Sequence, residues 1–146
     1  MEEVNFKHRM PAQIRFSDVD QFGHVNNSVY FSLYDLAKTT YMTEAFSKPQ
    51  LDMMAVVVAN INANFLVPVF FSDKIVIETA TIHLGNKSFT LHQRAIDTES
   101  GIVKCECKTI MVVYDMATKE PMPIPEEYKK AICEYEKKSL EDLMNR

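Results

Sequence analysis

The spacing of hydrophobic and polar positions predicts one long helix early in the chain. Between residues 26 and 46, apolar side chains recur every three or four positions, which is the period of one helix face. Asn26, Asn27 or Ser28 can cap the start of this helix, because short polar side chains accept hydrogen bonds from its free N–H groups. The residues expected on its buried face are Val29, Leu33, Leu36, Thr40 and Tyr41.

Five other segments have the alternation, or the Val, Ile and aromatic content, of strands. The alternation is clearest in 88–97, where Phe89 and Leu91 fall on one face and Thr90 and His92 on the other. Short polar turns separate the last three of these segments. The expected strands are 6–16, 53–67, 74–84, 88–97 and 102–114.

The order of these elements predicts the fold class. Short connections between successive strands favour an antiparallel sheet, and the long helix has to bury its apolar face against that sheet. Residues 48–52, with Pro49, and residues 115–125 are expected loops, whereas 126–145 has the spacing of a terminal helix. We therefore expect one α+β domain over residues 1–146. Its antiparallel sheet of about five strands wraps around one long helix, with an additional C-terminal helix.

Composition and charge exclude several classes of protein. The chain has 146 residues, of which 47% are hydrophobic and 25% charged, as in an ordinary globular domain. Its net charge is −4 and it has no basic tract, so nothing indicates nucleic-acid binding. No apolar stretch approaches the roughly 20 residues of a membrane span, and the N-terminus has no signal-peptide pattern. We therefore expect a cytoplasmic protein that binds neither nucleic acid nor membrane.

The three cysteines do not form a metal-site or disulfide pattern. Cys105 and Cys107 lie two positions apart in an expected strand, on one face but too far apart for a comfortable disulfide. No further ligands stand at zinc spacing. Free, packed thiols and no bound metal are therefore expected, which fits a reducing compartment.

Polar residues concentrate in the segment between the first expected strand and the long helix. It reads RFSDVDQFGHVNNSVY from Arg15 to Tyr30, with two carboxylates, a glycine, a histidine and two asparagines. Asp18 and Asp20 are ordinary turn formers. A carboxylate at such a junction can also lie near the positive end of a helix, where an electrophilic carbonyl is polarised. This segment is therefore the candidate site.

The same segment carries a family resemblance. The pattern RF-x-D-x-D, followed by GHVNN-x-x-Y at the start of a long helix, resembles the hotdog-fold acyl-CoA thioesterases, and among them the 4-hydroxybenzoyl-CoA thioesterase and acyl-CoA thioester hydrolase group. FLVP at 65–68, Asp73 and LGNKS at 84–88 are similar to later motifs of the family. The resemblance extends over about residues 5 to 130. It implies a hotdog fold and hydrolysis of acyl-CoA to a carboxylic acid and coenzyme A, without a metal or a separate cofactor.

The resemblance also implies roles for residues of the GHVNN segment. The family's catalytic carboxylate falls on Asp20, as general base or nucleophile, and its oxyanion donor falls on the backbone N–H near Asn27. Gly23 allows close approach of the backbone to the ligand. His24 is expected to orient Asp20, to contact the thioester or merely to pack. In the similar plant acyl-carrier-protein thioesterases an asparagine stands where this chain has Phe22, which favours the aspartate-centred mechanism here.

Other residues are expected to contact the substrate. Tyr30 is a candidate for the core or the pocket wall. Asn86, Lys87 and Ser88 are candidates for binding coenzyme A phosphates or pantetheine, or form a solvated turn. In the family the site lies between subunits, so the resemblance implies a homodimer or homotetramer, with the turn at 85–88 supplied by the neighbour.

Two alternatives to a thioesterase remain open. A non-catalytic acyl-thioester-binding or assembly protein of the same fold would keep the motif and make Asp20 dispensable. A hydratase or dehydratase of this fold would carry a different acid–histidine pattern, and the proline of one such pattern is absent between Asp20 and His24. The sequence leaves the acyl group open, as well as the carrier, which is either coenzyme A or acyl carrier protein.

Overall fold

The computed structural model describes residues 4–53 and 55–145. Its elements are β1 (His8–Ala12), the 3₁₀ turn η1 (Phe16–Asp18), α1 (Asn27–Ala45), α2 (Lys48–Met53), β2 (Val56–Phe65), β3 (Ile75–Leu84), β4 (Ser88–Asp97), β5 (Val103–Asp115), β6 (Glu120–Pro121), α3 (Glu126–Glu136) and α4 (Leu140–Met144).

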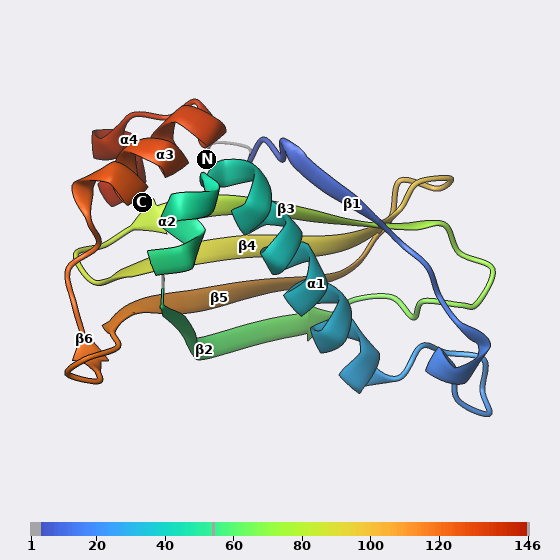
Figure 1. The fold of residues 1–146 in the computed structure, drawn as a ribbon. Helices are drawn as coiled ribbons and strands as arrows, with labels where there is room; N and C mark the ends of the chain where they lie inside the picture. The colour runs from blue at the N-terminus through green and yellow to red at the C-terminus, as the bar shows by residue number, and fades with distance from the viewer. Residues whose placement is uncertain (1–3, 54, 146) are drawn as a thin grey trace.

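The strands form one antiparallel sheet in the order β1-β3-β4-β5-β2, and the short β6 pairs with the end of β5. Figure 1 shows α1 lying across one face of this sheet, while α3 and α4 gather at the end where α1 finishes. The predicted α+β architecture, a sheet around one long helix, is therefore confirmed. None of the described helices is long and apolar enough to cross a membrane.

The core has two parts along the length of α1. One lies under its C-terminal half and joins β3, β4 and β5 to α3 and α4, with Tyr41, Phe89 and Ile132 as members. The other lies under its N-terminal half and includes Tyr34 and Ile77. This second part supports the segment that precedes α1, where the candidate residues lie.

The prediction for the buried face of α1 was right only in part. Tyr41 is buried, and Val29 and Leu33 are partly buried against the core, as expected. Tyr30, a candidate for the core or the pocket wall, is also buried, whereas the burial of Tyr34, Ala37 and Lys38 had not been predicted. Leu36 points away from the sheet and is 56% exposed. Tyrosine rings supply large apolar areas and carry a hydroxyl that needs a partner, so a search for aliphatic residues passes over them.

Residues 48–52 form a helix instead of the predicted loop. Ser47 and Gln50 cap α2 reciprocally: the Ser47 N–H donates to Gln50 Oε1 at 2.9 Å, and the Gln50 N–H donates to Ser47 Oγ at 3.4 Å. Pro49 lies in the first turn, where its missing N–H costs no hydrogen bond. A serine followed three positions later by a glutamine is the sequence signature of such a capped helix start. The prediction of a loop rested on Pro49 and overlooked this signature.

Two other boundaries differ from the predictions. The expected single helix over 126–145 is two helices, because Lys137 adopts a left-handed conformation with φ 55° and Ser139 caps α4. The first strand ends at Ala12 rather than at Phe16, since the chain turns into η1. Met54, within the expected second strand, lies outside the described residues.

Candidate active site

Asp20 sits at an exposed turn that its own side chain closes. Its Oδ1 accepts the backbone N–H groups of Phe22 at 2.9 Å and His24 at 3.2 Å. The backbone of Asp20 also pairs with His24 O at 2.9 Å and with the Gly23 N–H at 3.0 Å. Gly23 has a φ of 80°, a conformation that glycine adopts without strain. Asp20 Oδ2 accepts no hydrogen bond from the described residues and stays available to a ligand.

Asp18, the other carboxylate, is structural. Its side chain is buried, accepts the Arg15 N–H at 2.8 Å and lies 3.0 Å from the Arg15 guanidinium. The hydrogen bond from Arg15 lowers the pKa of Asp18 below its usual value. The Asp18 carbonyl accepts the Asn26 N–H at 2.9 Å, so this residue fixes the chain on both sides of the Asp20 turn.

The first turn of α1 leaves one backbone donor free. Asn26 is the N-cap, and its side chain accepts the Ser28 N–H at 3.0 Å, while its carbonyl accepts the Val29 N–H at 2.9 Å. The Asn27 N–H has no hydrogen-bond partner within the described part of the chain. It therefore points a free donor outward from the positive end of a 19-residue helix.

The loop between β2 and β3 forms a second wall of the site. The Val25 N–H donates to Val69 O at 2.8 Å, and His24 and Phe70 form an isolated β-bridge. The His24 ring lies edge-on to Phe70, with centroids 5.1 Å apart. Tyr30 is buried beside Phe65, with centroids 5.2 Å apart. The structure thus joins Asp20, Gly23 and His24 in one turn, while Asn27 and Tyr30 lie in the first turn of α1, which follows it.

Large aromatic side chains surround this turn without being covered. Phe16 is 84% exposed, Phe22 72% and Phe71 52%, and the rings of Phe16 and Phe71 lie 6.3 Å apart. Exposed apolar clusters of this kind are typical of surfaces that bind a ligand or a partner.

The turn at 85–88 lies at the other end of the sheet. The pairing of Ala12 with Ile75 places the start of β3 near the candidate site, and its last residue, Leu84, is about 30 Å further along the strand. Figure 1 shows the β3–β4 turn opposite the loop that precedes α1. Asn86 and Lys87 use their carbonyls to bind the backbone of Ile124 and Val113. Within one chain, Asn86, Lys87 and Ser88 are therefore not brought to Asp20.

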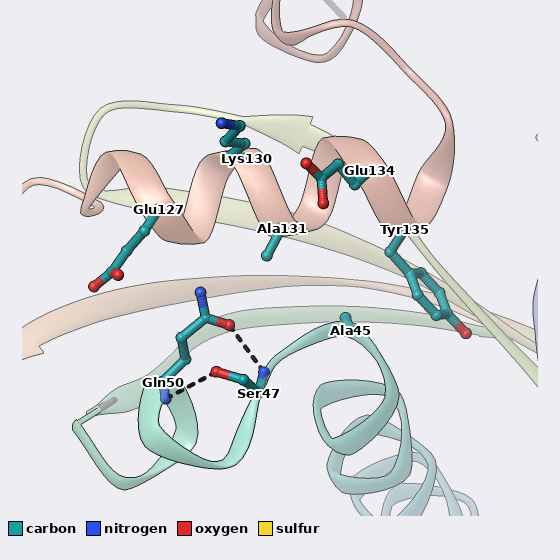
Figure 2. Close-up of a pocket in the computed structure, with 8 residues that line it drawn as sticks. All are labelled: Ala45, Ser47, Gln50, Glu127, Lys130, Ala131, Glu134 and Tyr135. Carbon is teal, nitrogen blue, oxygen red and sulfur yellow. Dashed lines mark hydrogen bonds between the residues drawn. The ribbon is translucent and has the colours of Figure 1, made fainter.

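A groove elsewhere on the molecule does not belong to this site. It lies between α2 and α3 and is lined by Gln50, Lys130, Glu134 and the residues labelled beside them in Figure 2. This groove lies at the C-terminal end of α1, about 27 Å from Asn27 along the helix. Two of its polar residues, Ser47 and Gln50, cap α2 and so have a structural role.

Comparison with known proteins identifies the family. The sequence model of the thioesterase-like superfamily matches residues 14–132. The chain belongs to the thioesterase-like superfamily. This confirms the predicted hotdog family and its enzyme class, a thioester hydrolase.

Solved thioesterase structures share the fold. A thioesterase from Thermus thermophilus, in complex with coenzyme A and Zn, has a TM-score of 0.80 and 25% identity, over 92% of this chain and 98% of that one. The probable thioesterase YbaW from Escherichia coli has a TM-score of 0.77 and 25% identity, over 85% and 95%. An uncharacterized Bacillus subtilis protein, YsmA, is 26% identical over 118 residues, which are 81% of this chain and 78% of that protein.

Sequence reasoning missed one residue of this thioesterase-like site. The alternation in 102–114 puts Lys104 on the polar face of its strand, opposite Cys105 and Cys107, yet its side chain is only 8% exposed and forms an ion pair with Asp73. The one available signal was Asp73, which belongs to a motif of the family and had no assigned partner.

Proposed function

We propose that the protein hydrolyses acyl-CoA thioesters to a free carboxylic acid and coenzyme A. The observation that carries this proposal is that one short segment holds both a carboxylate oxygen and, seven positions later at the start of α1, a backbone N–H, neither of which has a hydrogen-bond partner among the described residues. Asp20 supplies the base or nucleophile, and the Asn27 N–H supplies the oxyanion donor. Membership of the thioesterase-like superfamily supports this assignment.

The chemistry divides between these two groups. As a general base, Asp20 takes a proton from water as the water oxygen attacks the thioester carbon. As a nucleophile, it forms a mixed anhydride that water then cleaves. In both routes the carbonyl oxygen becomes negative and accepts the Asn27 N–H. The tetrahedral intermediate then collapses: the C=O bond re-forms, the C–S bond breaks, and coenzyme A leaves as a thiolate that takes up a proton. In this proposal the carboxylate and the N–H supply the catalytic groups and coenzyme A arrives with the substrate, so the scheme needs no separate cofactor or metal.

We infer that the neighbouring residues bind the acyl thioester. Phe16, Phe22 and Phe71 offer apolar surface to the acyl group, and Tyr30 lines the wall behind it. His24 lies between Asp20 and Phe70, so it contacts the thioester or holds the turn. An acyl carrier protein can replace coenzyme A as the carrier, since the reacting thioester is the same.

A second copy of the chain completes the proposed site. β2 is an edge strand that pairs only with β5 among the described strands, and its exposed side chains include Val57, Val58, Ile61 and Phe65. Joining two β2 edges antiparallel removes this exposed edge. It also places the far end of one sheet, with the turn at 85–88, beside the Phe65 end of the other. Asn86, Lys87 and Ser88 then bind coenzyme A from the neighbouring subunit, in a homodimer or a pair of dimers.

Turnover tests the proposed reaction. Purified protein is offered acyl-CoAs of increasing chain length and with aromatic acyl groups, and the matched acyl carrier proteins, while loss of thioester absorbance is followed. Hydrolysis of at least one series is expected. If the protein binds acyl-CoA by calorimetry and hydrolyses none, it is an acyl-thioester-binding protein instead.

Sedimentation tests the proposed assembly. A dimer is expected for the unmodified protein and a monomer for Val58→Lys, which places a charge on the β2 edge. Ile102→Lys is the matched control, because Ile102 has a similar exposed fraction, 45% against 48%, and lies outside β2. A Val58→Lys variant that stays dimeric contradicts the β2 interface.

A further inference from the structure

A lysine with a buried ammonium group joins the sheet to the loop behind the candidate site. Lys104 is the second residue of β5, and its Nζ lies 3.1 Å from Pro68 O and 3.2 Å from Asp73 Oδ2. Its backbone carbonyl accepts the N–H groups of Leu66 at 2.9 Å and Val67 at 3.0 Å. Both ends of Lys104 therefore hold the same loop, the connection between β2 and β3.

This loop needs an anchor because of the sheet order. β2 is at one edge, and β3 lies beyond β5 and β4, so residues 66–74 have to cross the ends of two strands. The crossing segment contains no helix or regular strand to stabilise it. Asp73 closes its last turn by accepting the Phe70 N–H at 2.9 Å on the same oxygen that meets Lys104.

Burial of this ammonium group is costly. The side chains of Lys104 and Asp73 are 8% and 17% exposed, so both charges have lost most of their water. Buried ion pairs commonly stabilise a fold no better than apolar side chains of similar volume. Replacing both charges by apolar side chains would therefore cost little stability, whereas removing only one leaves the other buried without a partner. What the pair adds beyond stability is one fixed geometry of the loop.

Two contacts connect this loop to the segment that carries the reacting groups. Val69, next to the Pro68 carbonyl that Lys104 holds, accepts the Val25 N–H at 2.8 Å. Phe70, held by Asp73, forms the β-bridge with His24. His24 in turn pairs with Asp20, and Val25 immediately precedes the cap of α1.

We propose that Lys104, through Asp73 and Pro68, is a positioning residue for the reaction at Asp20 and the Asn27 N–H. This inference rests on the proposed thioester hydrolysis. Lys104 touches neither substrate nor reacting atoms; it sets the distance between the carboxylate and the oxyanion donor. A displacement of about 1 Å at such a distance costs on the order of 100-fold in rate.

The test replaces the charge and keeps the length of the side chain. Lys104→Met is expected to lower kcat by about 10- to 100-fold with KM changed much less, because positioning acts on the transition state. Lys104→Arg keeps a cation and is expected to recover part of kcat. Lys108→Met, on the same strand with an exposed side chain, is the matched control and keeps the kcat of the unmodified protein.

A second measurement does not depend on activity. Hydrogen exchange of the Val25 amide is expected to become about tenfold faster in Lys104→Met and in Asp73→Asn, while amides in the middle of β3 and β4 keep their rates. The double variant is expected to resemble either single variant, because both remove the same ion pair. Asp73→Asn also serves if Lys104→Met fails to fold.

The outcomes separate the two proposals. If the unmodified protein hydrolyses no acyl thioester but Val25 exchange responds as expected, the proposed function is wrong. The structural coupling between the Lys104–Asp73 pair and Val25 is then still supported. If the unmodified protein is active and Lys104→Met keeps its kcat, the positioning role is wrong. A parallel loss of protection over the whole sheet also overturns it, because Lys104 would then only stabilise the fold.

Discussion

The Asp20 carboxylate accepts the backbone N–H of His24 at 3.2 Å, on the same oxygen that accepts the Phe22 N–H. One oxygen of the candidate base thus closes a turn, while the other is free of partners among the described residues. The turn-forming and the catalytic interpretations of this residue are therefore compatible, because they use different atoms. They can also be separated by substitution.

Asp20→Asn is expected to lower kcat/KM by about 10²- to 10⁴-fold without lowering the melting temperature. The amide oxygen can still accept the N–H groups of Phe22 and His24, but it has no basicity. Asp20→Ala loses the acceptor as well, so it is expected to be both inactive and less stable. Steady-state kinetics and thermal unfolding of both variants check this. An Asn variant with full kcat/KM shows that Asp20 is only a turn former.

His24→Phe distinguishes the possible roles of His24. The contacts of His24 are its backbone bonds to Asp20 and its ring against Phe70, and phenylalanine can keep both. We expect kcat to fall by less than tenfold, which is below the usual contribution of about 10²- to 10⁴-fold from a group that transfers a proton. His24→Ala removes the ring contact and is the comparison. A loss above about 100-fold in the phenylalanine variant indicates that an imidazole nitrogen acts in the reaction.

Much of the fold could be predicted because its signals are local. The strict alternation over 88–97 gives β4 with the predicted boundaries, and the polar residues before Val29 place the start of α1 within one residue. The candidate site lies in the same region, and its residues Asp20, Gly23, His24 and Asn27 are close in sequence, so they cannot be far apart in space. Short-range order is what a single sequence states most directly.

The errors concern interactions between distant segments. Lys104 looked like a solvated strand residue, because its partner Asp73 is 31 positions earlier and the loop that covers it leaves no periodic pattern. The buried face of α1 was misjudged for a related reason. Tyr34 and Ala37, which were missed, share a core cluster with Ile77 of β3 and Cys105 of β5, and neither strand is visible from the helix alone.

The three thiols are expected to react at very different rates with a thiol reagent. Burial raises the pKa of Cys107 to about 11 and also raises that of Cys105, so neither forms appreciable thiolate at neutral pH. Burial also raises the pKa of Cys133, but this thiol is only half-buried, so a reagent can reach it. The folded protein should therefore release about one equivalent of chromophore, and the unfolded protein all three. Cys133→Ser is expected to abolish the reaction of the folded protein, and rapid labelling of Cys105 or Cys107 would contradict the structure.

His8 is expected to make stability fall on the acid side of neutrality. Its ring is 1% exposed, lies edge-on to Tyr41, and neither nitrogen has a hydrogen-bond partner among the described residues. Burial lowers the pKa of His8 below 6.5, an effect that Glu44, 4.0 Å away, partly opposes. The unfolded chain therefore binds this proton more readily. The stability due to neutral His8 is complete above pH 6.5 and is lost as the pH falls through its lowered pKa.

Substitutions of His8 and of Glu44 should change the loss of stability at acid pH in opposite directions. His8→Leu removes the titrating group and is expected to flatten the fall of melting temperature below about pH 6.5. It should keep or raise the melting temperature at about pH 8, because no hydrogen bond is lost.

Glu44→Gln keeps an acceptor for the Tyr135 hydroxyl but removes the charge that favours protonated His8. It is expected to lower the pKa of His8 further and so to extend the loss of stability to lower pH. Thermal unfolding in matched buffers measures both, and a His8→Leu curve that runs parallel to that of the unmodified protein would assign the loss of stability at acid pH to other groups.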